Sequence, residues 1–153
     1  MSNPILTPTT VCQVAIVVND IERIAKNYAT VFGVPVPPIH ETGPASETLI
    51  SYRGQTTPGR AKLAFFSLGS LQLELIEPID GPSTWRDVLE KNGPGLHHIA
   101  FQVPKTQATS QQLAELGAEV VQTGDFKVGN YSYVDATRTL GVMVELLESY
   151  PTK

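Results

Sequence analysis

The sequence has one cysteine, few basic residues and no long apolar run, and each shortage excludes a class of protein. Cys12 has no second cysteine with which to form an internal disulfide, which favours a reduced, cytoplasmic compartment. No apolar stretch approaches the roughly 20 residues of a membrane helix, and the N-terminal residues resemble no signal peptide. The 11 Lys and Arg residues form no dense run, and the formal net charge is -4. We therefore expect a soluble cytoplasmic protein with neither nucleic acid nor membrane as a partner.

Enough apolar residues remain to fill one core. The chain has 153 residues, of which 41% are hydrophobic, so residues 1–153 are expected to form a single domain. Secondary-structure signals occur in the order βαβββ twice. The first set is at residues 11–18, 19–33, 48–53, 61–67 and 71–77, and the second at residues 97–103, 106–119, 120–124, 127–135 and 141–148. We expect two modules, at about 9–78 and 95–149.

The connections carry clear start and stop signals. Asp20 is predicted to cap the first helix and Gly33 to end it. The Pro- and Gly-rich residues 34–47 are predicted to be a loop. A short helix between the modules is expected to begin after Ser83 or Thr84 and to end at Gly93.

Two alignments support an internal repeat. Setting VCQVAIVV over LHHIAFQV matches apolar positions and places Gln13 over His98. Setting LQLELIEP over VMVELLES places Glu74 over Glu145. Strand alternation puts these four residues on the faces opposite the apolar rows that would pack on helices. They are therefore predicted to converge.

Each of these residues has an ordinary explanation when it is considered alone. A lone carboxylate on a strand is usually solvated, and a lone histidine is usually structural. However, Glu74 and Glu145 lie in runs apolar enough to be buried, where an unpaired charge is costly, and a metal ion would remove that cost. Glu77 and Glu148, at the strand ends, are expected to be exposed. His97 alternates with His98, so we expect it to face a helix as a packing or supporting residue.

At these residues the chain resembles the vicinal oxygen chelate superfamily, which includes glyoxalases, bleomycin resistance proteins and dioxygenases. The segments that carry the resemblance are VAIVVNDIERIAKNYATVFG, AKLAFFSLGSLQLELIEP, GLHHIAFQV and LGVMVELLE. The second and third are most similar to methylmalonyl-CoA epimerases. The resemblance implies an α+β fold in which two βαβββ modules form a curved mixed sheet. It also implies metal ligands from the first and last strand of each module, which are again Gln13, Glu74, His98 and Glu145.

The implied activity is removal of a proton next to a carbonyl, with a divalent ion (Ni, Co, Mn, Mg or Zn) stabilising the enolate or enediolate. The resemblance assigns the catalytic base to Glu145, and an epimerase would use Glu74 as a second base. Gln13 stands where such epimerases usually have His, and the resulting ligand set is similar to that of some glyoxalase I enzymes. A lactoylglutathione lyase acting on a thiol hemithioacetal is therefore an alternative. A metal-free binding or resistance protein is another, whereas Gln13 argues against an extradiol dioxygenase.

Substrate contacts and assembly follow less directly. Arg60, Lys62 and Lys127 are candidates to meet the anionic tail of an acyl-CoA or a glutathione adduct. Tyr133 shares a strand face with Tyr131 and is expected to contact the substrate. The resemblance further implies a homodimer.

Overall fold

Most of the chain forms one curved sheet. The computed structural model describes residues 3–6 and 11–152. The longer strands are β1 (Gln13–Val17), β5 (Arg60–Leu68), β6 (Leu71–Asp80), β7 (Gly95–Gln102), β8 (Glu119–Phe126), β9 (Gly129–Ala136) and β10 (Val142–Ser149). Two-residue strands are β2 (His40–Glu41), β3 (Ser51–Tyr52) and β4 (Gln55–Thr56). The helices are α1 (Ile21–Phe32), α2 (Ala45–Thr48), α3 (Thr84–Asn92) and α4 (Thr106–Ala114).

The sheet joins the two halves of the chain through its central strands. Its order is β2-β5-β6-β1-β7-β10-β9-β8-β3-β4. At the centre β1 pairs antiparallel with β7, while β6 and β10 lie parallel to β1 and β7 respectively. The α+β fold class and the curved mixed sheet expected from the sequence are confirmed. The module boundaries stay a prediction, and the expected start near residue 9 lies outside the described residues.

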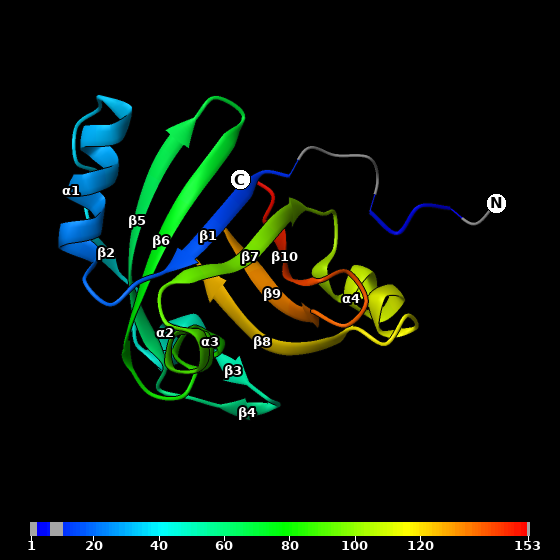
Figure 1. Cartoon of the computed structure of the whole chain (residues 1–153). Coiled ribbons are helices and arrows are strands. Elements are labelled where there is room, and N and C mark those ends of the chain that lie inside the picture. The colour runs from blue at the N-terminus through cyan, green and yellow to red at the C-terminus, as the bar shows by residue number, and fades with distance from the viewer. Residues whose placement is uncertain (1–2, 7–10, 153) are drawn as a thin grey trace.

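Helices α1 and α4 cover the outer face of the sheet at opposite ends of the molecule (Figure 1). The buried face of α1 packs against Phe66, Leu73 and Leu75. At the other end Leu113 of α4 packs against Val144 and Leu146. Burial of each such side chain stabilises the fold by about 1.5–3 kcal/mol. These packing layers leave the alternate strand positions facing the concave side of the sheet.

Helix α3 lies in the lower part of Figure 1 and packs against β6, β7 and β1. Its N-cap is Ser83, whose hydroxyl accepts the Arg86 N–H, and Gly93 ends it as predicted. Trp85 packs with Ile76 and Tyr133 in the apolar cluster on this side. None of the helices in the described ranges is long and apolar enough to cross a membrane.

The prediction for residues 34–56 is wrong in detail. The expected loop contains the edge strand β2 and the start of α2. Of the expected strand 48–53, only residues 51–52 form a strand, β3, and Thr48 ends α2. Strand β3 pairs with β8, so this segment extends the far edge of the sheet rather than the first half. Two-residue strands carry no periodicity, and pairing with a strand about 70 residues away leaves no local signal.

Glu77 and Glu148 are not exposed as expected. Glu77 is half-buried, and its carboxylate accepts the N–H of Ile21 at 2.7 Å. Glu148 is buried and accepts the N–H of Thr106 at 3.0 Å. Each glutamate thus satisfies a free N–H group in the first turn of an outer helix, where the helix dipole also favours negative charge.

Candidate metal centre

Four central strands bring the predicted ligands together through their register. Across β6, β1, β7 and β10, one row of neighbours is Glu74, Ala15, His98 and Met143. The adjacent row is Gln72, Gln13, Ala100 and Glu145. Ala15 and Ala100 are fully buried between the larger side chains. Because these alanines occupy little space, the longer side chains of both rows can turn toward one point.

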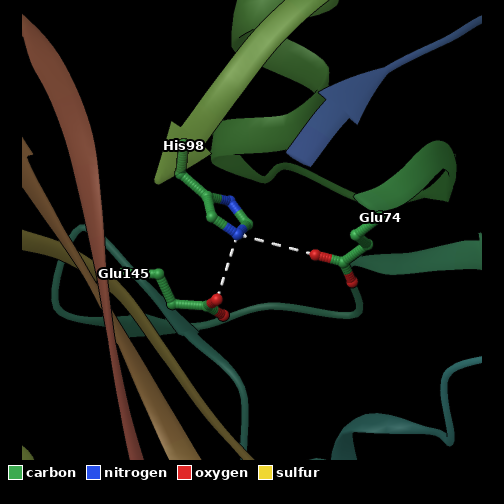
Figure 2. A group of neighbouring side chains, drawn as sticks. All are labelled: Glu74, His98 and Glu145. Atoms are coloured by element: carbon green, nitrogen blue, oxygen red, sulfur yellow. Dashed lines mark ion pairs between the residues drawn. The ribbon is translucent and has the colours of Figure 1, made fainter. Parts of the chain in front are cut away.

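That point is the ring of His98 (Figure 2). Its Nε2 lies 3.0 Å from Glu145 Oε2 and 3.5 Å from Glu74 Oε2. The Gln13 Oε1 atom lies 3.0 Å from the same nitrogen. The candidate ligand atoms of Glu74, His98 and Glu145 all lie within 4.8 Å of one another, and all three side chains are buried. The structure therefore gathers the four residues predicted from the sequence.

Burial opposes charge on every titratable member of the cluster. It lowers the pKa of His98 to about 3, so the imidazole is neutral. Burial and the charge of Glu145 raise the pKa of Glu74 well above its usual range. Burial likewise raises the pKa of Glu145, an effect that the Tyr133 hydroxyl partly offsets. Two ionised carboxylates are therefore unfavourable here unless one of them takes up a proton or a cation binds between them.

The donor set fits a divalent cation. A neutral imidazole, two carboxylates and an amide oxygen are ligands that hard or borderline metal ions accept. The Gln13 amide has two possible orientations. With Nε2 turned inward it would donate to Glu145 Oε2 at 2.8 Å, whereas with Oε1 inward it presents a fourth lone pair. A cation, or a proton on one of the neighbouring groups, compensates the second arrangement, so the amide can serve the site with or without an ion.

Gln13, Glu74 and Glu145 of the cluster line a cavity of about 970 Å³. Leu63, Phe65 and Leu147 give it apolar walls, and Tyr131 and Tyr133 lie beside the carboxylates. Burial raises the pKa of both tyrosines, so their hydroxyls remain protonated.

Only some of the residues predicted to contact the substrate line the cavity. Tyr133 lines the cavity. Lys62 lies on the outer face and pairs with Glu22 of α1 at 3.0 Å, away from the cavity. Arg60 pairs with Glu41 and Asp80. By contrast, Lys127, in the turn between β8 and β9, lines the cavity and forms no ion pair within the described part of the chain.

Comparison with known families agrees with this architecture. The sequence model of the Glyoxalase/Bleomycin resistance protein/Dioxygenase superfamily matches residues 12–134. The chain belongs to this superfamily. The match includes Gln13, Glu74 and His98 and ends before Glu145. The resemblance identified from the sequence is confirmed.

The chain is similar to two curated proteins, one uncharacterized and one a named enzyme. The uncharacterized protein YqjC of Bacillus subtilis is 36% identical over 92 residues, which is 58% of this chain and 66%, just under two thirds, of that protein. The ethylmalonyl-CoA/methylmalonyl-CoA epimerase of Cereibacter sphaeroides is 31% identical over 117 residues, 76% of this chain and 77% of that enzyme.

Several solved structures share the fold. A hypothetical protein, BH1468 from Bacillus halodurans, is 19% identical with a TM-score of 0.67, over 96% of this chain and 99% of that one. The methylmalonyl-CoA epimerase from Mycobacterium tuberculosis is 22% identical with a TM-score of 0.62, over 95% and 94%. A variant of the Streptomyces coelicolor epimerase in complex with 2-nitronate-propionyl-CoA is 20% identical with a TM-score of 0.64, over 96% and 99%.

Sequence reasoning missed the residues that support the cluster. Gln72 binds the Gln13 amide at 2.6 Å, and its position on the same strand face as Glu74 was an available signal. His97 contacts a helix, as expected, but the helix is α3 rather than α4: its ring lies beside His98 and Thr84, away from the row of Ile99 and Phe101. The β1–β7 register shifts between Ala15, opposite His98, and Ile16, opposite Leu96, so His97 is an extra residue that breaks the alternation. A bulge of this kind leaves no mark in a sequence of alternating residues.

Proposed function

We propose that this protein is a divalent-metal-dependent enzyme that removes the proton next to the carbonyl of an acyl thioester, as a methylmalonyl-CoA epimerase does. The observation that carries the proposal is the pair of buried carboxylates, Glu74 and Glu145, which approach one imidazole from the two halves of the chain. The relationship to the Cereibacter epimerase supports the substrate class.

Gln13, Glu74, His98 and Glu145 would hold the ion. When bound, the cation supplies positive charge beside the carbonyl oxygen on which negative charge develops as the proton leaves. His98 contributes a neutral Nε2 lone pair, and Gln13 contributes its amide oxygen without adding charge. At each stage of the proposed reaction one of the two glutamates would be ionised and help to hold the ion, while the other would carry the exchangeable proton.

The two glutamates have complementary tasks in this mechanism. An epimerase breaks the C–H bond on one face of the substrate, leaves the electron pair in the enolate, and returns a proton to the other face. Glu145 is the base that accepts the proton, and Glu74, at the equivalent position of the other half, donates a proton from the opposite side. A positioned base of this kind typically contributes about 10²–10⁴-fold to the rate.

The cavity provides the setting for this chemistry. Its apolar walls, which include Phe65 and Leu147, place the carboxylates in a largely apolar setting that a bound substrate would close from water. The hydroxyl of Tyr133 stays protonated, so it can donate to a carboxylate or to the substrate. Lys127 supplies a positive charge to meet an anionic substrate tail.

A glyoxalase I-like lyase is the second candidate, and Gln13 at the first ligand position is the observation that favours it. Isomerisation of a thiol hemithioacetal also moves a proton next to a carbonyl, so the same carboxylates would serve it. The cavity walls and Lys127 are compatible with either a CoA or a glutathione tail.

Two measurements on the purified protein test these proposals. The protein is first reconstituted with Mn²⁺, Co²⁺, Ni²⁺, Mg²⁺ or Zn²⁺. Elemental analysis is then expected to find one ion per chain. Retention of no ion would favour a metal-free binding protein. The loaded protein is then incubated in D₂O with methylmalonyl-CoA, or with methylglyoxal and glutathione. Deuterium at the carbon next to the thioester supports the epimerase, and lactoylthiol formation supports the lyase. If neither product forms, both proposals are rejected.

A further inference from the structure

His97 begins a buried chain of hydrogen bonds that leads from the metal cluster to helix α3. Its Nδ1 lies 2.8 Å from Nδ1 of His98, and its Nε2 lies 3.1 Å from the Thr84 hydroxyl. The Thr84 hydroxyl and the Thr84 backbone N–H both reach Oε1 of Gln122, at 3.3 and 2.9 Å. All four side chains are buried. The bulge at His97 is what turns its ring into this chain.

The direction of the protons along the chain is determined at the Gln122 end. A backbone N–H can only donate, so Gln122 presents its carbonyl oxygen to Thr84, while its Nε2 donates to the Tyr131 hydroxyl at 3.1 Å. That oxygen can only accept, so the Thr84 hydroxyl donates to it and offers His97 a lone pair. His97 then carries its proton on Nε2 and leaves Nδ1 free to accept.

The same sequence of bonds sets the state of His98. With an acceptor at His97 Nδ1, the proton of His98 is on Nδ1 and its Nε2 presents a lone pair to Glu74, Glu145 and Gln13. The other tautomer would reverse the two bonds of His97, to His98 and to Thr84, and would direct the Thr84 hydroxyl proton away from Gln122. A metal ligand whose second ring nitrogen is held in this way is both oriented and made more basic.

We infer that His97 and Thr84 are positioning residues that hold His98 in the tautomer with a free Nε2 lone pair, so that it can bind a divalent ion. This inference rests on the metal site proposed above. The ring of Tyr133 packs against both histidines, with centroids 5.0 Å from His97 and 4.9 Å from His98, and restricts their rotation. His97 therefore acts through His98 and does not contact the ion.

The experiment breaks the chain at two places, each with a matched control. His97→Phe keeps a ring but removes both nitrogens, whereas His97→Asn retains an acceptor near the position of Nδ1. Thr84→Val removes the hydroxyl at nearly constant volume, whereas Thr84→Ser retains it. If His97→Phe does not fold, Thr84→Val tests the same chain from its far end. Folding is followed by circular dichroism and thermal unfolding.

Two readouts distinguish positioning from a structural role. Long-range ¹H–¹⁵N correlation spectra of the metal-free protein report the His98 tautomer, and titration with Mn²⁺ reports the dissociation constant. We expect His97→Phe and Thr84→Val to mix the tautomers and to raise the Mn²⁺ dissociation constant about 10–100-fold. His97→Asn and Thr84→Ser should stay near the wild type.

The two proposals can fail separately. If the wild type binds no Mn²⁺, the proposed metal function fails, and the spectra of the metal-free protein still report the tautomer. If folded His97→Phe and Thr84→Val keep the wild-type tautomer, or bind Mn²⁺ within about twofold of the wild type, His97 and Thr84 have no positioning role.

Discussion

Four glutamates on two strands show that the surroundings of a side chain decide its role. Glu74 and Glu77 are three positions apart on β6, as are Glu145 and Glu148 on β10, so each strand presents one carboxylate to each face. On the concave face the carboxylates meet His98 and one another. On the outer face they receive the N–H groups of helices α1 and α4. One residue type therefore supplies both the candidate site and the helix caps.

The first residue-scale prediction concerns Glu145. Glu145→Gln keeps the size and polarity of the side chain but removes the base, so kcat for the proposed proton transfer should fall about 10²–10⁴-fold. The measurement is isotope exchange, with whichever substrate the D₂O assay proposed above identifies. Unfolding temperature serves as a control, because relief of a buried charge should leave stability unchanged or raise it. Full turnover in a folded Glu145→Gln protein would remove Glu145 from the mechanism.

The second residue-scale prediction separates two lysines that composition cannot distinguish. Lys127 lines the cavity, whereas Lys62 points outward to Glu22. Lys127→Ala should raise KM for an anionic thioester about 1.5–5-fold, as expected for an exposed charge pair, and leave kcat unchanged. Lys62→Ala is the matched control and should change neither constant. Equal effects in steady-state kinetics would place the anionic tail elsewhere.

At the scale of the element, the sequence predicts long strands and helices better than short ones. Helix α1 was recognised with both of its ends, since the Asp20 carboxylate accepts the Arg23 N–H and Gly33 adopts a positive φ of 67°. Strands β2 and β4 were not predicted, and β3 was predicted only as part of a longer strand. Each is two residues long; β2 and β3 pair with distant strands, whereas β4 pairs with the adjacent β3.

The element-scale prediction concerns the start of α4. Glu148→Ala leaves the buried Thr106 N–H without an acceptor, so the free energy of unfolding should fall by about 1–3 kcal/mol. Chemical denaturation of the two proteins measures the difference. Glu90→Ala, on the exposed surface of α3, is the control and should change stability by less than about 0.5 kcal/mol.

This stabilisation should depend on pH. Hydrogen bonds from Lys105 and from the Thr106 N–H lower the pKa of Glu148, so the unfolded chain binds this proton more tightly than the folded one. The contribution is therefore complete above the unfolded pKa of about 4.3 and is lost as the pH falls through the lower folded value. The difference between wild type and Glu148→Ala should be constant near neutral pH and shrink in acid. A difference that grew in acid would contradict the role of the carboxylate.

At the scale of the whole molecule, one chain contains every residue of the candidate site. Strands β1 and β7 pair within the chain, so Gln13 and Glu74 of the first half meet His98 and Glu145 of the second. We expect one divalent ion per chain, with a stoichiometry that does not change on dilution. Calorimetric titration with Mn²⁺ at two protein concentrations measures it. Half an ion per chain, or loss of binding on dilution, would mean that the site lies between chains; the expected homodimer stays a prediction.

The sequence by itself determined the long strands, helix α1 and the faces of Gln13, Glu74 and Glu145, because these follow from periodicity along the chain, and the family resemblance of its motifs implied the α+β fold class. It also singled out Gln13, Glu74, His98 and Glu145, since polar residues in apolar strands are conspicuous. Only the tertiary structure decided that Lys62 faces away from the cavity, that β3 joins β8, and that His97 turns toward His98. These outcomes depend on strand register, a bulge and contacts between distant segments, which local residue patterns do not encode.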